Sequence, residues 1–284
     1  METLTPTTFL SGLKFPECPR WHNGRLWFSD MRAGRVMVVD QAGRAESIIE
    51  VPGDPGGLGF RPDGSLIVVS MRGRRLLRYH EGALLPFADL SAYEPVANND
   101  MTLDADGRAY VGGFGFDIRT AGEQPRTTNL ILVTPDGEVG PVAADLNFPN
   151  GIVISADGRT LIVAETFARR LTAFEVAPDG SLSGRRTFAE FPKAVPDGIC
   201  IDAEGAVWLA SPATREFLRV EDGGTITHRI ELSGRRAYAC MLGGEDRRTL
   251  FLCTAETNPQ DPAAATAQGW IETVRVDVAG AGWP

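Results

Sequence analysis

The chain has 284 residues and a formal net charge of −9, and 43% of its residues are hydrophobic. The negative charge argues against nucleic acid or an anionic membrane as a partner, and no apolar run approaches the ~20 residues that a membrane span requires. The 32 Gly and 19 Pro residues suit many strands and tight turns, so we expect one domain over residues 1–284.

A turn followed by a short apolar strand recurs six times along the chain. Successive turn glycines lie 40 to 51 residues apart, and Asp-Gly between apolar runs is a strong hairpin signal. A period of ~40–50 residues with room for about four strands is typical of propeller blades. Since no segment shows sustained helical periodicity, the sequence predicts an all-β, six-bladed β-propeller. The repeats begin at Asn23-Gly24, Asp63-Gly64, Asp106-Gly107, Asp157-Gly158, Glu204-Gly205 and Asp246-Arg247, the last without the glycine.

Four of the apolar strands begin with a polar side chain that can bind a metal. We call Glu17, Asn99, Asn150 and Asp197 the strand-start residues. Burying such groups unpaired costs several kcal/mol, and a radial repeat brings equivalent positions together around one axis. The sequence therefore predicts a metal site in the central tunnel, where one cation satisfies all four.

The strand-start residues form an all-oxygen set with charge −2, which suits one hard divalent cation. Ca²⁺ is the first candidate and Mg²⁺ or Mn²⁺ come next. Zn²⁺, which would be expected to recruit His or Cys, and Fe²⁺ stay as further alternatives. The competing interpretation is that Pro-Asn-Gly and Pro-Asp-Gly are ordinary turns. The metal is favoured because these turns precede the apolar strands, whereas the Asp-Gly turns follow them, and because Glu17 is a poor turn former.

The same residues carry a family resemblance. The segments are Phe15–Trp21, Asn99-Asp100, Asn150-Gly151 and Pro196–Gly205. Together they resemble the senescence marker protein 30 (SMP-30)/gluconolactonase/luciferin-regenerating-enzyme-like family over nearly the whole chain. The resemblance implies a six-bladed propeller with a divalent metal, usually calcium, held by Glu17, Asn150 and Asp197. It also implies that Asn99 is a close or water-mediated ligand that contacts substrate, and that Asp197 is the acid/base.

A site of this kind can open a lactone. The cation polarises the carbonyl group and stabilises the oxyanion, while a carboxylate takes a proton from the attacking water. Asp197 lies in a flexible Pro-Asp-Gly turn and is the predicted base, and Glu17 is the anionic ligand. Asn99 and Asn150 offer carbonyl oxygens to the metal and NH₂ groups to the substrate or to neighbours.

Loops that follow the second strand of each blade are expected to return to the metal-bearing face. Their residues Met71, Phe114, Phe116 and Phe167 are the expected substrate contacts beside Asn99. Members of the family that act on sugar lactones carry Arg where this chain has Ala97, and an acidic residue where it has Phe114 and Phe116. The difference predicts a substrate less polar than a sugar lactone. The alternative is that both phenylalanines pack between blades.

We therefore expect a divalent-metal-dependent hydrolase of a lactone or related cyclic ester, with Asp197 and Asn99 as catalytic residues. Two alternatives stay open. The same site can serve organophosphate or aryl ester hydrolysis, or an isomerisation or elimination in a biosynthetic pathway. The second alternative is a non-catalytic, ligand-binding propeller with a structural ion. No Gly-x-Ser-x-Gly nucleophile elbow and no phosphate-binding Gly-rich loop occurs in the sequence.

The four cysteines and the beginning of the chain bear on the compartment. The cysteines show no CxxC spacing and lie in or beside apolar strands, as buried free thiols do. The first residues lack the charged-then-apolar plan of a signal peptide. We expect a cytoplasmic monomer or small homo-oligomer that acts on a small molecule.

Overall fold

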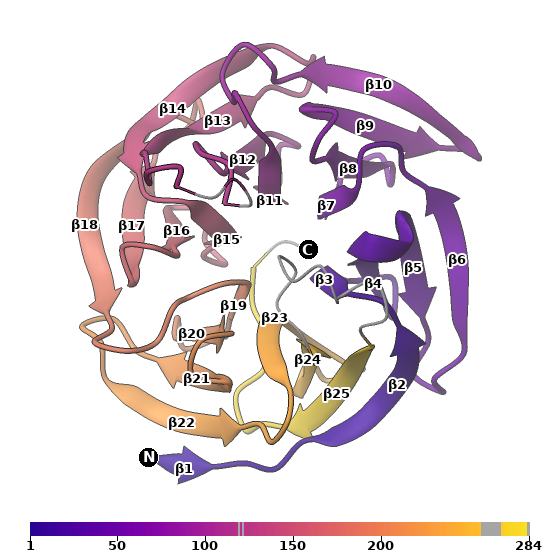
Figure 1. The fold of residues 1–284 in the computed structure, drawn as a ribbon, viewed down its shortest axis with the longest axis vertical. Coiled ribbons are helices and arrows are strands. Elements are labelled where there is room, and N and C mark those ends of the chain that lie inside the picture. Colours follow the sequence, from indigo (N-terminus) through magenta and orange to yellow (C-terminus); the bar gives the residue numbers. More distant parts are fainter. Residues whose placement is uncertain (119, 121, 257–267, 283–284) are drawn as a thin grey trace.

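The six repeats form the six blades of a propeller. The computed structural model describes residues 1–118, 120, 122–256 and 268–282. Six sheets surround a central axis, and in each the strand that precedes the turn of the predicted repeat is innermost (Figure 1). The predicted all-β, six-bladed β-propeller is confirmed.

Blades one to four follow the chain from the axis outward, and every strand pair in them is antiparallel. Blade one has β3 (Pro16–His22), β4 (Arg25–Asp30), β5 (Arg35–Val39) and β6 (Ala45–Glu50), and blade two has β7 (Pro55–Phe60), β8 (Leu66–Ser70), β9 (Arg75–His80) and β10 (Ala83–Asp89). Blade three has β11 (Asn98–Leu103), β12 (Ala109–Gly113), β13 (Thr128–Val133) and β14 (Val139–Leu146), and blade four has β15 (Pro149–Ile154), β16 (Thr160–Glu165), β17 (Arg170–Val176) and β18 (Leu182–Glu190).

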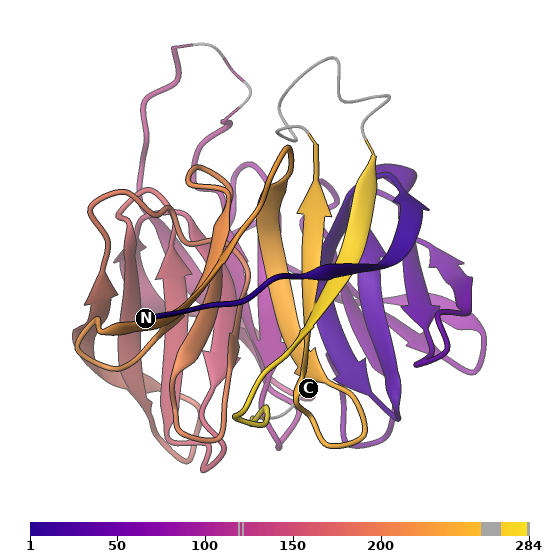
Figure 2. The ribbon, with the colours of Figure 1, turned by 90° about the horizontal axis from the view of Figure 1, so that it is seen from below.

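The last two blades take their outermost strands from the beginning of the chain. β2 (Thr7–Leu13) pairs antiparallel with β25, and β1 (Glu2–Thr3) pairs parallel with β22. The N-terminal segment crosses the side of the molecule to reach them (Figure 2). This pairing joins the two ends of the repeat array and covers sheet edges that would otherwise be open. Blade five has β19 (Ile199–Ile201), β20 (Val207–Ser211), β21 (Glu216–Val220) and β22 (Ile226–Glu231), and blade six has β23 (Arg236–Gly243), β24 (Thr249–Ala255) and β25 (Gly269–Arg275).

The turns between the first and second strands explain the glycines of the repeat. Gly64 and Gly158 have φ values of 80° and 71°, in the left-handed region that side chains disfavour. In the sixth repeat Arg247 takes this role with a φ of 57°. The predicted hairpins therefore form in all six repeats, including the one that has lost its glycine.

The hydrophobic core lies between neighbouring blades. Side chains such as Leu58 on β7 and Val36 on β5 share one buried cluster across the boundary of blades one and two. Trp208, Tyr110 and Phe28 are among the largest fully buried side chains. Within the described part of the chain, no helix has the length and apolar character needed to cross a membrane.

Candidate functional site

The strand-start residues lie at or just before the beginnings of the innermost strands, which surround the central axis (Figure 1). Glu17 lies on β3, Asn99 on β11 and Asn150 on β15, while Asp197 lies just before β19. The register of β3, β11 and β15 against their neighbours shifts at these positions. Such bulges bend a strand and change the direction of a side chain. The sequence correctly puts these residues at or just before the beginnings of strands, but it gives no sign of the bulges.

Glycines bring these strand starts into contact around the axis. A Cβ atom on Gly151 would collide with the backbone of Ile199, and one on Gly198 would collide with Ala239. The Gly151 N–H donates to the Asp197 carbonyl (3.2 Å), and the Gly198 N–H donates to the carbonyl of Tyr238 (2.8 Å). The glycines of the Asn-Gly and Asp-Gly pairs therefore let blades four, five and six approach one another closely.

Glu17 and Asp197 are carboxyl groups whose ionisation is unfavourable in the free protein. Burial raises the pKa of Glu17 well above its ordinary value, and the Asp197 charge raises it further. Burial also raises the pKa of Asp197 to about 8, against hydrogen bonds from Asn150 and Gly198 that lower it. Asp197 nevertheless keeps partial exposure, whereas Glu17 is buried. A cation between them would favour the charged form of both groups.

The two carboxamides are held differently. The Nδ2 atom of Asn150 donates to Oγ1 of Thr166 (3.2 Å), which in turn donates to the Pro196 carbonyl (2.9 Å). This chain of hydrogen bonds joins the start of β15 to the segment that carries Asp197. Asn99 is buried, and its Nδ2 atom has no hydrogen-bond partner among the described residues. Asn99 therefore carries a buried donor without a partner in the described part of the chain.

A buried ion pair lies close to Glu17 and Asn99 along the same two strands. Arg20 on β3 contacts Asp100 on β11, with 2.9 Å between Nη2 and Oδ1. The backbone N–H of Met101 also donates to the same carboxylate (2.8 Å). Because Arg20 compensates the charge of Asp100, we do not assign Asp100 as a metal ligand. This pair was not predicted from the sequence.

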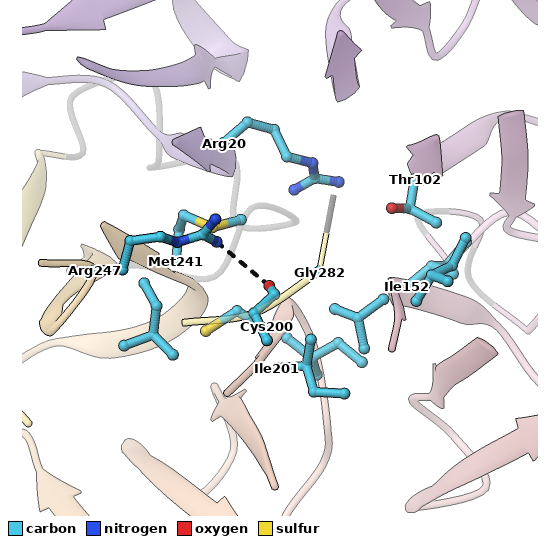
Figure 3. Close-up of a pocket in the computed structure, with 13 residues that line it drawn as sticks. Arg20, Thr102, Ile152, Cys200, Ile201, Met241, Arg247 and Gly282 are labelled. Atoms are coloured by element: carbon cyan, nitrogen blue, oxygen red, sulfur yellow. Dashed lines mark hydrogen bonds between the residues drawn. The ribbon is translucent and has the colours of Figure 1, made fainter. Parts of the chain in front are cut away.

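A small cavity lies further along the same strands. Its volume is about 20 Å³, room for roughly one water molecule. The C-terminal segment covers it, since Ala281 N–H donates to the Ile201 carbonyl (3.0 Å) and Gly280 N–H to the Arg247 carbonyl (2.8 Å). Figure 3 shows Arg247 reaching toward this segment. Its lining includes Arg20, Thr102, Ile152, Cys200, Met241, Arg247 and Gly282.

The expected substrate contacts lie on connections next to the strand starts. Met71 and Phe116 are buried, Phe114 is half-buried and Phe167 is 46% exposed. Phe148 was not predicted, and it packs against Phe114, Phe116 and Phe167. Its position directly before Pro149-Asn150 was the available signal.

The described residues contain no group of three or more His, Cys, Asp and Glu side chains that could hold a metal. The expected site has two carboxylates and depends on carboxamide oxygens for the rest. All four cysteines are buried and free, as expected.

Comparisons with known proteins give a consistent result. The chain is 28% identical over 280 residues to a 6-deoxy-6-sulfogluconolactonase of Pseudomonas putida, covering 94% of this chain and 93% of the relative. It is 28% identical over 281 residues to a pentonolactonase of Haloferax volcanii, covering 94% and 92%. The structure of regucalcin, a calcium-binding protein from Agrobacterium tumefaciens, superposes with a TM-score of 0.83 at 20% identity, covering 100% of this chain and 98% of that one.

The family assignment rests on most of the chain. Residues 15–256 match the SMP-30/Gluconolactonase/LRE-like region. This range contains all four strand-start residues and all the phenylalanines described above. The chain belongs to the SMP-30/Gluconolactonase/LRE-like family.

Proposed function

We propose that this protein is a divalent-cation-dependent hydrolase that opens a lactone or a related cyclic ester. The observation that carries the proposal is the pair of carboxyl groups on Glu17 and Asp197, held at the axis beside two carboxamides. Similarity to proteins named as lactonases supports the reaction class.

The donor set fits a hard divalent cation. Two carboxylates supply charge −2, and side-chain amides supply neutral oxygens, a combination that Ca²⁺ commonly binds. Burial raises the pKa of both carboxyl groups, and a dication is the partner that would offset this cost. Glu17, Asn150 and Asp197 would hold the cation, with Asn99 beside them. When bound, the cation would polarise the ester carbonyl and stabilise the negative charge that develops on its oxygen.

Asp197 is assigned as the general base and acid. Its partial exposure leaves it accessible to water, and the neighbouring Asn150 side chain and Gly198 N–H favour its charged form. It accepts a proton as water adds to the carbonyl carbon, and it returns that proton to the ring oxygen as the C–O bond breaks. The product is a hydroxy acid.

Asn99 is assigned to substrate positioning. Its Nδ2 atom is buried and has no partner in the described part of the chain. A substrate oxygen that accepts this N–H would satisfy the group and fix the orientation of the ester.

The test is hydrolysis of lactones, aryl esters and phosphotriesters by metal-stripped and Ca²⁺-reconstituted protein. We expect lactone hydrolysis that depends on the cation. A stronger activity on phosphotriesters or aryl esters would support another reaction at this site. Tight cation binding without turnover of any of the three would support a ligand-binding propeller.

A further inference from the structure

Four phenylalanines form one contiguous cluster on the connections of blades three and four. The ring centroids of Phe114 and Phe148 lie 4.6 Å apart in a stacked arrangement, and those of Phe148 and Phe167 lie 5.0 Å apart edge to face. Phe116 contacts both Phe148 (6.0 Å) and Phe167 (5.5 Å). We call these four residues the phenylalanine cluster.

Backbone hydrogen bonds tie the cluster to the strands that carry the two carboxamides. The Phe114 N–H donates to the Ala97 carbonyl (3.0 Å), in the segment that leads into Asn99. The Thr166 N–H donates to the Phe148 carbonyl (3.2 Å), and Thr166 is also the side-chain partner of Asn150. The cluster therefore lies beside the part of the candidate site that Asn99 and Asn150 form.

Backbone geometry and hydrogen bonds restrain the phenylalanine cluster. Phe148 has a φ of 59°, a strained value for a bulky residue that persists only where the surroundings determine it. The buried carboxyl group of Glu94 accepts hydrogen bonds from the Gly115 N–H (3.3 Å) and from Oγ1 of Thr128 (3.1 Å). Glu94 thus fixes the turn between Phe114 and Phe116. Such preorganisation lowers the entropic cost of binding.

The cluster presents apolar surface to solvent through Phe167 and the half-buried Phe114, whereas Phe116 and Phe148 are buried. Phe167 is 46% exposed and is one of three exposed large hydrophobic residues in the part of the chain that is described, with Met1 and Leu85. A cluster tied to the strands that carry Asn99 and Asn150 offers apolar contact but no side-chain hydrogen bonds. Hydroxyl groups placed against it would lose their hydrogen bonds to water without gaining others.

We infer that the phenylalanine cluster binds an apolar substituent of the substrate, so that the preferred substrate is an alkyl- or aryl-substituted lactone rather than a polyhydroxylated one. Phe167 then contacts the substituent and determines specificity, and the buried Phe148 positions the Phe167 ring. The inference rests on the proposed function and names the substrate class for that site.

The test compares kcat/KM for a phenyl-substituted γ-lactone with kcat/KM for gluconolactone, in Ca²⁺-loaded protein. The wild type prefers the phenyl-substituted lactone. Phe167→Ala, at an exposed position that tolerates truncation, lowers this preference about tenfold, the equivalent of roughly 55 Å² of lost apolar contact. The fall appears in KM for the phenyl-substituted lactone, and kcat/KM for gluconolactone falls less than kcat/KM for the phenyl-substituted lactone. Phe148→Leu lowers the preference in the same direction.

Leu85→Ala is the matched control, since Leu85 is also exposed but lies on the outer strand β10. It leaves the preference unchanged. A wild-type preference for gluconolactone, or a preference that Phe167→Ala leaves intact, overturns the inference.

A binding measurement separates this inference from the reaction class. Calorimetry with the phenyl-substituted hydroxy acid, the ring-opened form, requires no turnover. About tenfold weaker binding to Phe167→Ala than to wild type supports the inference even if no lactone is hydrolysed. The absence of lactone hydrolysis would overturn only the proposed function. Equal binding to both proteins overturns the inference even where lactones are hydrolysed.

Discussion

The guanidinium group of Arg20 on β3 lies 2.9 Å from the carboxylate of Asp100 on β11, and both side chains are buried. Arg20 also donates to the carbonyls of Pro19 (2.8 Å) and Met101. The pair thus joins the innermost strands of blades one and three, and its members lie three residues after Glu17 and one residue after Asn99. Arg20 and Asp100 compensate each other's charge, so removing either charge leaves the other buried and uncompensated.

Arg20→Leu should lower the free energy of unfolding by about 3–5 kcal/mol, because Asp100 would stay buried without its counter-charge. Urea denaturation at neutral pH measures this. Arg25→Leu is the control, since the Arg25–Glu46 pair (3.0 Å) is exposed and is expected to contribute little. Equal shifts of the two denaturation midpoints would contradict the role given to Arg20.

Ca²⁺ should raise the melting temperature of chelator-treated protein. A ligand that binds only the folded state stabilises it by about 2.7 kcal/mol at a concentration of 100 times Kd. Scanning calorimetry across a Ca²⁺ titration measures this. Glu17→Gln removes one of the two carboxylates and should move the titration to higher Ca²⁺. Glu165→Gln is the control, because that buried carboxylate already has arginine partners. A Ca²⁺ response that is the same in all three proteins would rule out Glu17 as a ligand.

Asp197→Asn and Glu17→Gln should separate the base from the anchoring ligand. Asp197→Asn keeps an oxygen ligand but cannot accept a proton, so kcat should fall on the order of 10²-fold or more at saturating Ca²⁺. Glu17→Gln should regain much of its activity with excess Ca²⁺. Steady-state kinetics across a Ca²⁺ series distinguishes the two. Equal rescue of both variants would show that Asp197 is only a ligand.

The blades and the strand starts could be predicted from the sequence because both depend on local pattern. The turn glycines and the apolar runs locate the hairpins, and Glu17, Asn99 and Asn150 are conspicuous at the beginning of apolar strands. Radial symmetry then brings them to the axis without further information.

Features that depend on contacts between distant segments could not be predicted in the same way. The pairing of β2 with β25 joins segments from opposite ends of the chain, and nothing in Thr7–Leu13 indicates its partner. The Arg20–Asp100 pair and the packing of Phe148 against Phe167 likewise form only when separate blades or connections meet. A single sequence contains the residues but not their neighbours.

The buried carboxylate of Glu165 should make the stability of blade four depend on pH. Burial alone would raise its pKa, but hydrogen bonds from Thr172 (2.5 Å), the Asn147 N–H (2.8 Å) and Arg170 (2.8 Å) hold the pKa below its ordinary value of 4.5. A carboxyl group with a depressed pKa stabilises the folded state above its unfolded pKa, and this contribution is lost as the pH falls through the folded pKa.

Glu165→Gln should therefore be less stable than wild type at pH 7, since Arg170 and Arg185 lose their shared carboxylate. The difference should begin to shrink as the pH falls below the unfolded pKa of about 4.5, and it should vanish once the pH is below the depressed pKa of the folded carboxyl group. Urea denaturation of both proteins between pH 7 and pH 3 tests this. Asp222→Asn is the control, because the Asp222–Arg186 pair (2.6 Å) is exposed. A stability difference between wild type and Glu165→Gln that is constant over this range would show that the carboxylate stabilises the fold through packing rather than charge.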